Sequence, residues 1–139
     1  MKERINSRRI LVIPIVMMLL VFFLFREVFM IGFVPTGSME PTIEAGSYVL
    51  GIRKIKDIQT GDIIIFEKDG SYLVKRIAAC GGDEIYHNGQ GVTVPDGCFY
   101  VLGDNAEDSY DSRYWEEPFV EENQVVAIVV WSYKRAGLR

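Results

Sequence analysis

DIIIFEKDGSYLVKRIAA, residues 62–79, contains two apolar runs separated by Asp69-Gly70. Both runs are rich in Ile, Val, Phe and Tyr, residue types that favour strands. Asp-Gly between two such runs is a strong signal for a tight turn. The segment therefore predicts a β-hairpin with strands at 62–66 and 72–79.

Runs of similar composition lie on both sides of this hairpin. They predict further strands at residues 47–52, 85–86, 92–94, 99–102 and 125–133. After residue 31 no segment has the apolar period of a convincing amphipathic helix. About 105 residues are enough for one small core. The expected fold is therefore mostly β: an N-terminal transmembrane helix followed by a small, largely antiparallel β domain over residues 32–139.

The N-terminal quarter has the composition of a membrane segment. Its run ILVIPIVMMLLVFFLF, residues 10–25, has sixteen uncharged residues and follows Arg8-Arg9. A helix of that length spans about 24 Å, so flanking residues must help it to cross a hydrocarbon core of about 30 Å. We predict one transmembrane anchor over residues 10–31. A removable secretory signal is the alternative, but no small-x-small site follows the run before Ser38.

Charge is distributed unevenly along the chain. The first nine residues carry +3, which leaves −7 on the rest of a chain whose formal net charge is −4. Basic flanks of membrane helices stay on the cytoplasmic side. We therefore expect a single-pass cell-membrane protein whose partner is the lipid bilayer, with residues 1–9 cytoplasmic and 32–139 extracytoplasmic. The acidic balance of the domain argues against a nucleic-acid partner.

A serine stands on a short rigid turn in VPTGSMEPT, residues 34–42. Pro35 and Pro41 fix their own φ angles, and Gly37 lets the backbone bend just before Ser38. Such a turn presents a side chain together with backbone N–H groups. An ordinary loop serine has the same surroundings, because turns favour Ser, Gly and Pro. The turn alone therefore assigns no chemistry.

Lys75 is oddly placed on the second strand of the hairpin. A two-residue period puts it on one face with Leu73 and Ile77. Burial disfavours an ammonium group, so a lysine on an apolar face can be a neutral amine near pH 7 and act as a general base. If its head reaches solvent from an edge strand, it is only a surface lysine. A Ser–Lys pair needs no histidine, and His87 beside Asn88-Gly89 suits a hairpin turn better.

The acidic segment GDNAEDSYDSRYWEEPFVEENQ, residues 103–124, is too long for a routine connection. It lacks the spacing of an EF-hand, because Ala106 and Trp115 fall where ligands belong. A solvated acidic loop is the simpler interpretation, and we predict no metal and no cofactor. Cys80 and Cys98 lack the spacing of a zinc site, but they could pair as a disulfide if their Cα atoms lie within about 7 Å.

Four ordered segments resemble those of bacterial type I signal peptidases, membrane-anchored Ser–Lys endopeptidases that remove secretory signal peptides. They are PTGSMEPT (35–42), GDIIIF (61–66), KRI through GD (75–83), and GDN followed by SYDSR (103–105 and 109–113). About twenty residues separate Asp83 from Gly103, so the chain is similar to the compact single-anchor forms. Endoplasmic-reticulum-type and archaeal relatives carry histidine where Lys75 stands. Residues 106–108 differ from those common in the family.

The resemblance implies a β catalytic domain of the signal-peptidase type, a set of residue roles and signal peptides of preproteins as substrates. Ser38 would be the nucleophile and Lys75 the general base. Ser109 would orient the Lys75 amine, and the Thr36 hydroxyl would join the Ser38 N–H as an oxyanion donor. Asp111 would form an ion pair with Arg113 that fixes the loop.

Two stretches that flank Ser38 and Lys75, residues 33–35 and 72–74, could pair with an extended peptide as added strands. Shallow pockets would then suit small side chains, as small-x-small cleavage sites require. The candidate substrate-binding residues are Phe33, Val34, Met39, Tyr72 and Val74. For Val34, Met39 and Val74, plain core packing is an equally good interpretation.

Two other classes of protein are compatible with parts of this pattern. A self-cleaving Ser–Lys repressor relative would need a DNA-binding helical domain where this chain has an anchor. A noncatalytic, membrane-tethered β module that binds extended peptides needs no reactive serine. Reaction of Ser38 with a serine-directed acylating inhibitor separates the second class from a peptidase.

Overall fold

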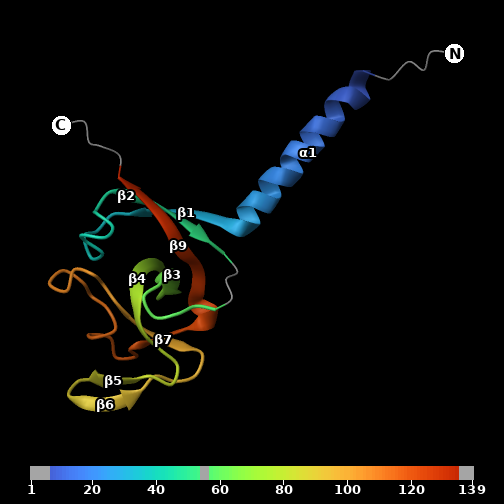
Figure 1. Cartoon of the computed structure of the whole chain (residues 1–139). Coiled ribbons are helices and arrows are strands. Elements are labelled where there is room, and N and C mark those ends of the chain that lie inside the picture. The colour runs from blue at the N-terminus through green and yellow to red at the C-terminus, as the bar shows by residue number, and fades with distance from the viewer. Residues whose placement is uncertain (1–6, 54–56, 135–139) are drawn as a thin grey trace, which may run out of the picture.

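Helix α1 (Ser7–Val28) opens the described part of this computed structural model, which comprises residues 7–53 and 57–134. The helix projects away from the strands (Figure 1). Its segment Leu11–Val28 is long and apolar enough to cross a membrane, and none of it is buried against the rest of the chain. Within the described ranges no other helix has these properties. Of the segment 1–9 that we expect to be cytoplasmic, residues 1–6 lie outside the described ranges.

The helix is shorter than the anchor segment 10–31 that the sequence predicts. It ends at Val28, and strand β1 (Phe29–Val34) begins at the next residue. Every residue of β1 pairs with β2 (Ser47–Ile52), from Phe29 opposite Ile52 to Val34 opposite Ser47. The composition FMIGFV suits a helix or a strand, and this long-range pairing decides between them. The helical part of the prediction is therefore corrected to end at Val28.

Seven strands form one antiparallel sheet in the order β1-β2-β9-β3-β4-β7-β8 (Figure 1). The mostly β fold that the sequence predicts is confirmed. After β1 and β2, the strands of this sheet are β3 (Ile63–Lys68), β4 (Ser71–Cys80), β7 (Cys98–Leu102), β8 (Phe119–Glu121) and β9 (Val125–Lys134). A separate hairpin contains β5 (Glu84–His87) and β6 (Gln90–Thr93), and a single 3-10 turn, η1 (Glu122–Gln124), precedes β9.

The predicted hairpin is the pair β3 and β4, with Lys68 opposite Ser71. Asp69 and Gly70 both have positive φ, at 52° and 75°, as a two-residue hairpin turn requires. The other predicted strands are also present: β2 has the predicted bounds, and the ends of the remaining strands are shifted by one or two residues. The sequence prediction missed β1, whose first three residues it assigned to the anchor, and β8, whose three residues are too short to show a period.

The core lies on both faces of β3. Successive residues of this strand point to opposite faces, so Ile64 and Phe66 enter one cluster and Ile65 enters another. The first cluster also contains Ile77, Phe99, Val101, Trp115 and Val120, and the second contains Val34, Met39, Ile43, Val49 and Ala127. The segments that carry Ser38 and Ser109 are thus held over the sheet by their own buried neighbours, Met39 on one side and Trp115 on the other.

Cys80 and Cys98 are both free thiols in the structure. Cys80 lies opposite Phe99 in the sheet and packs with it against the first cluster. Cys98 is the preceding residue on the same strand, so it points to the other face, where it packs against Ala79, Val94 and Tyr100. The two side chains are therefore on opposite sides of the sheet and do not pair.

Candidate active site

The turn between β1 and β2 is fixed by its own backbone hydrogen bonds. The Glu40 N–H donates to the Gly37 carbonyl at 3.0 Å, and the Ile43 N–H donates to the Met39 carbonyl at 2.9 Å. Met39 and Ile43 are fully buried beneath it. Ser38 is thus mounted on a rigid turn above the second cluster, with its side chain at the rim of a groove.

Strand β4 brings Lys75 to this serine. Lys75 Nζ lies 2.7 Å from Ser38 Oγ, within hydrogen-bond distance, although the two residues are 37 positions apart. Both are buried, with exposed fractions of 4% for Lys75 and 8% for Ser38. The structure therefore brings together the two residues that the sequence singles out, and Lys75 is not a surface lysine.

Burial lowers the pKa of Lys75 below its ordinary value of 10.5. The carboxylate of Asp111 acts against this effect and raises the pKa, whereas the guanidinium of Arg113 lowers it. Asp108 raises it more weakly. The net effect favours the neutral amine, which is the form that can accept a proton.

Asp111 is a buried carboxylate next to this pair, with no exposed surface. It accepts hydrogen bonds from Ser109 Oγ at 2.7 Å, from the Gly103 N–H at 2.9 Å and from Arg113 Nε and Nη2 at 2.9 and 2.8 Å. Burial by itself raises the pKa of Asp111, but the hydrogen bonds from Arg113, Gly103 and Ser109 outweigh it and hold the pKa at about 2. Asp111 is therefore ionised at any physiological pH, and the predicted pairing of Asp111 with Arg113 is present.

Ser109 has a different partner from the one that the resemblance implies. Its hydroxyl donates to Asp111, and in the described part of the chain it forms no hydrogen bond with Lys75. Ser109 nevertheless lines the same groove as Lys75 and is buried there. Its influence on the amine would thus pass through Asp111, whose charge acts on Lys75.

Two residues that the sequence prediction passed over hold the loop after β7 against the Ser38 turn. The Asn105 N–H donates to the Ser38 carbonyl at 3.0 Å, and Asn105 Nδ2 donates to the Gly37 carbonyl at 3.1 Å. At Gly103, an added Cβ would lie 2.1 Å from Ser109 Oγ and 2.5 Å from the Ser38 carbonyl oxygen. Only glycine fits at that point. The Gly-Asp-Asn motif was the available signal, but no role followed from its residue types alone.

A third link joins the same loop to β4. Arg76 binds Asp104 through two hydrogen bonds, Nε to Oδ1 at 2.8 Å and Nη2 to Oδ2 at 2.6 Å. Its Nη1 also donates to the Gly61 carbonyl at 2.7 Å. Arg76 follows Lys75 directly, so this bidentate ion pair holds β4 and the loop in one relative position.

The groove at Ser38 has a volume of about 760 Å³. Its lining residues are Thr36, Gly37, Ser38, Leu73, Lys75, Glu107, Asp108, Ser109, Tyr110 and Tyr114. Of the candidate substrate-binding residues, Val34 and Met39 are buried in the second cluster, so core packing describes them. Val74 is partly buried against that cluster, whereas Phe33 and Tyr72 are exposed. Leu73 and the two tyrosines are groove residues that the sequence prediction missed.

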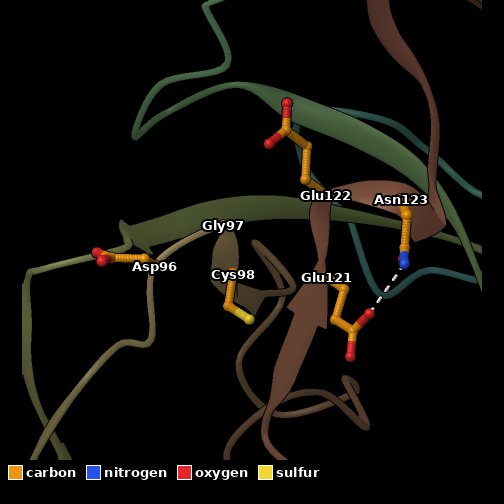
Figure 2. A pocket seen from close by; sticks show the side chains of 6 residues that line it. All are labelled: Asp96, Gly97, Cys98, Glu121, Glu122 and Asn123. Atoms are coloured by element: carbon orange, nitrogen blue, oxygen red, sulfur yellow. Dashed lines mark hydrogen bonds between the residues drawn. The ribbon is translucent and has the colours of Figure 1, made fainter.

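A second hollow, of about 560 Å³, lies between the start of β7 and the end of β8 (Figure 2). Asp96, Cys98, Glu121 and Glu122 project around it, and Asn123 Nδ2 donates to Glu121 Oε2 at 3.0 Å. Burial raises the pKa of the Cys98 thiol, which disfavours the nucleophilic thiolate. The hollow has no counterpart to the buried Ser38 and Lys75 pair, so we take the first groove as the candidate active site.

Comparison with known proteins identifies the family of the chain. The family model described as signal peptidase, peptidase S26, matches residues 7–94 and 86–134. The chain is 26% identical to signal peptidase I of Pseudomonas aeruginosa over 161 aligned positions, which cover 65% of this chain and 56% of that relative. It is 27% identical to signal peptidase I of Bacillus amyloliquefaciens over 112 positions, which cover 55% of this chain and 60% of the relative.

A third relative is subunit 1 of the mitochondrial inner membrane protease of Mus musculus. It is 34% identical over 90 positions, which cover 56% of this chain and 54% of the relative. The chain thus matches somewhat more than half the length of each of these relatives. The two bacterial relatives confirm the resemblance to type I signal peptidases. Because the family model covers α1, the Ser38 turn, β4 and the loop after β7, the chain belongs to the signal peptidase family, peptidase S26.

Proposed function

We propose that this protein is a membrane-anchored serine endopeptidase that removes N-terminal signal peptides from secreted preproteins at small-x-small sites. The observation that carries the proposal is the 2.7 Å hydrogen bond between the buried Lys75 amine and Ser38 Oγ. Because its pKa is lowered, Lys75 loses its proton more easily than an ordinary lysine and can act as a base, and a serine in contact with such a base can act as a nucleophile. Family membership supports the same reaction class.

The chemistry needs only these two side chains and water. Ser38 Oγ attacks the scissile carbonyl carbon while neutral Lys75 takes the hydroxyl proton. The resulting ammonium then gives this proton to the leaving amine as the C–N bond breaks, which leaves an acyl ester on Ser38. Lys75 next takes a proton from water, whose oxygen attacks the ester. The proton returns to Ser38 Oγ as the acid product leaves.

The negative charge that develops on the substrate oxygen needs donors beside Ser38. The Ser38 N–H donates no hydrogen bond within the described part of the chain, so it is free to bind an oxyanion. The Thr36 side chain is exposed and lines the same groove. We assign both groups as oxyanion donors, and loss of one such donor typically costs about 3 kcal/mol of transition-state stabilisation.

Two strand edges can receive the substrate as an extended chain. Strand β7 pairs with β4 only from Arg76 onward, so residues 71–75 have no partner on that side in the described structure. The outer edge of β1 is likewise unpaired there, since β1 pairs with β2 alone. Main-chain hydrogen bonds to such edges bind a peptide largely independently of its sequence. In this arrangement Phe33, Tyr72 and Val74 contact the peptide, and the buried Val34 and Met39 support the turn from below.

The bilayer is the second proposed partner. We infer that residues 1–9 are cytoplasmic, that the segment 10–31 contains the anchor, and that residues 32–139 form the extracytoplasmic catalytic domain. An aromatic face on the sheet that α1 leads into supports this arrangement. Phe33, Tyr48 and Tyr133 lie side by side on β1, β2 and β9, and all three are exposed. Trp131 is also exposed and stacks on Tyr133 at 5.7 Å. Trp and Tyr are enriched at membrane interfaces.

Cleavage of a preprotein by the full chain in detergent tests the proposal. Wild type should convert a preprotein with a small-x-small site to its mature form, and both Ser38→Ala and Lys75→Met should abolish this conversion. The exposed Ser71 and the half-buried Lys68, neither of which lines the groove, supply matched controls, and Ser71→Ala and Lys68→Met should retain activity. Far-UV circular dichroism checks that each variant is folded.

The same assay separates the peptidase from its main alternative. A noncatalytic β module that binds extended peptides would leave the preprotein intact and would not react with a serine-directed acylating inhibitor at Ser38. Normal turnover by Ser38→Ala or Lys75→Met would equally overturn the dyad.

A further inference from the structure

One wall of the active-site groove carries a negative charge. Glu107 and Asp108 line the groove beside Ser38 and Lys75, and both side chains are exposed. Neither carboxylate forms an ion pair within the described ranges of the chain. The sequence alone showed only that this position of the loop is acidic.

Two cations of the site, Arg113 and Lys75, already have partners of their own. Arg113 binds Asp111 through two nitrogens, and its Nη2 also donates to the Ala106 carbonyl at 3.4 Å. Lys75 is buried and hydrogen-bonded to Ser38 Oγ, and it forms no ion pair with either carboxylate. Glu107 and Asp108 therefore face the groove without an ion-pair partner in the described part of the chain.

Aromatic rings border the same wall. Tyr110 and Tyr114 line the groove and stack with ring centroids 6.2 Å apart and planes 13° apart. Their exposed fractions are 70% and 58%. Exposed tyrosine faces attract ammonium and guanidinium groups and cover the apolar stems of Lys and Arg. Arg113 already lies over the Tyr114 ring at 5.4 Å, which shows that this surface accepts a cation.

We propose that the groove selects peptides that carry Lys or Arg close to the scissile bond and disfavours those that carry Asp or Glu there. This inference rests on the proposed endopeptidase function and adds a charge preference to it. The cation would lie between the carboxylates of Glu107 and Asp108 and the faces of the tyrosines. A strand advances about 3.3 Å per residue, so only positions within about three residues of the scissile bond can reach this wall.

The expected preference is moderate, because the carboxylates are solvated. An exposed ion pair changes an equilibrium by about fivefold at most, and replacing a cation by an anion adds repulsion to the lost attraction. We therefore expect a ratio of about tenfold in kcat/KM between peptides that differ only by Lys against Glu at the best position. The ratio should decrease toward one as salt is raised. Exposed charges are screened beyond about 8 Å at physiological ionic strength, and added salt shortens this distance.

The test uses the full chain in detergent and peptides with one small-x-small site. Three peptides carry Lys, Gln or Glu at a single position, and the position is varied on both sides of the site. Activity is compared among wild type, Glu107→Gln/Asp108→Asn and the control Glu116→Gln/Glu117→Gln. The control removes the same charge from exposed residues that do not line the groove. Only the ratio between peptides is scored, because Asp108 also acts on the pKa of Lys75.

Binding of the same peptides to Ser38→Ala, followed by fluorescence anisotropy, gives a readout that does not depend on cleavage. A Lys over Glu preference that persists in the control and disappears in Glu107→Gln/Asp108→Asn supports the inference. Equal use of the three peptides at every position by an active wild type overturns the inference and leaves the proposed function intact. If wild type cleaves nothing, the proposed function fails, and equal binding of the three peptides to Ser38→Ala then overturns the charge preference as well.

Discussion

The guanidinium of Arg113 binds the buried carboxylate of Asp111 through Nε and Nη2, at 2.9 and 2.8 Å. Both groups act on the pKa of Lys75, in opposite directions. The pair is therefore more than a loop support, because the opposing charges of its two members adjust the basicity of an amine that hydrogen-bonds to neither of them.

Replacing Arg113 should shift the pH dependence of cleavage. A lysine base works when neutral, so wild-type activity should rise as the pH increases through the lowered pKa of Lys75. Arg113→Gln removes a positive charge that lowers this pKa and leaves Asp111, which raises it. The midpoint of the rise should then move to higher pH, as measured by kcat/KM on a preprotein from pH 6 to pH 11. Arg113→Lys keeps the charge and should move the midpoint less, and an unchanged midpoint in Arg113→Gln would contradict the electrostatic role.

Asp111 should make the folded domain sensitive to acid. Its pKa is about 2 in the folded chain against an ordinary value of 3.8. A depressed carboxyl pKa stabilises the fold above the unfolded-state value, and this stabilisation is lost as the pH falls from about 4 through about 2. The shift corresponds to about 2 kcal/mol. Asp111→Asn should lower the free energy of unfolding at pH 7 and flatten its dependence between pH 4 and pH 2, as followed by urea unfolding in detergent. The same slope in the variant would rule out this role.

Gly103→Ala should inactivate the enzyme without any change to a reacting group. The new Cβ would meet Ser109 Oγ and the Ser38 carbonyl oxygen at 2.1 and 2.5 Å, so both must move. A displacement of about 1 Å at a catalytic group can cost about 100-fold in rate. Gly91→Ala is the matched control, because its added Cβ has no neighbour within 4 Å. Cleavage assays and thermal unfolding are compared between the two variants. Wild-type activity in Gly103→Ala would contradict the prediction, because it would mean that the loop can move to accommodate the Cβ without disturbing the site.

The aromatic face on β1, β2 and β9 should contact lipid. The chain has two tryptophans, which makes the test simple: Trp131 is exposed on this face, and Trp115 is buried in the first cluster. In liposomes that contain brominated lipid, the fluorescence of Trp131 should be quenched in Trp115→Phe. The fluorescence of Trp115 in Trp131→Phe should be nearly unaffected. Equal quenching of the two residues, or none, would argue against this orientation of the domain.

Local signals in the sequence were sufficient for much of the fold. The hairpin of β3 and β4 is specified by its turn residues and strand composition, and α1 by an uninterrupted apolar run. The end of α1 could not be predicted, because FMIGFV suits a helix or a strand and becomes β1 only through pairing with β2. Strand β8 was missed for the same reason, since three residues become a strand only beside β7.

In the candidate site, too, local sequence signals were sufficient for some residues and insufficient for others. Ser38 and Lys75 could be selected because each is unusual in its own surroundings, a serine on a rigid turn and a lysine on an apolar face. The roles of Asn105 and Gly103 depend on how closely two distant loops approach, which no local pattern encodes. The actual partner of Ser109 was missed likewise, because the choice between Lys75 and Asp111 is made by three-dimensional distances alone.

Helix α1 ends at Val28 and β1 starts at Phe29, so no linker separates the membrane segment from the sheet that leads to Ser38. With α1 in a bilayer, the height of the nucleophile above the lipid would be set by strand length instead of by loop motion. The protein would then bind its substrates at one fixed distance from the membrane surface. A preprotein would be cleaved only if the distance between its membrane-embedded segment and its cleavage site allowed that site to enter the groove.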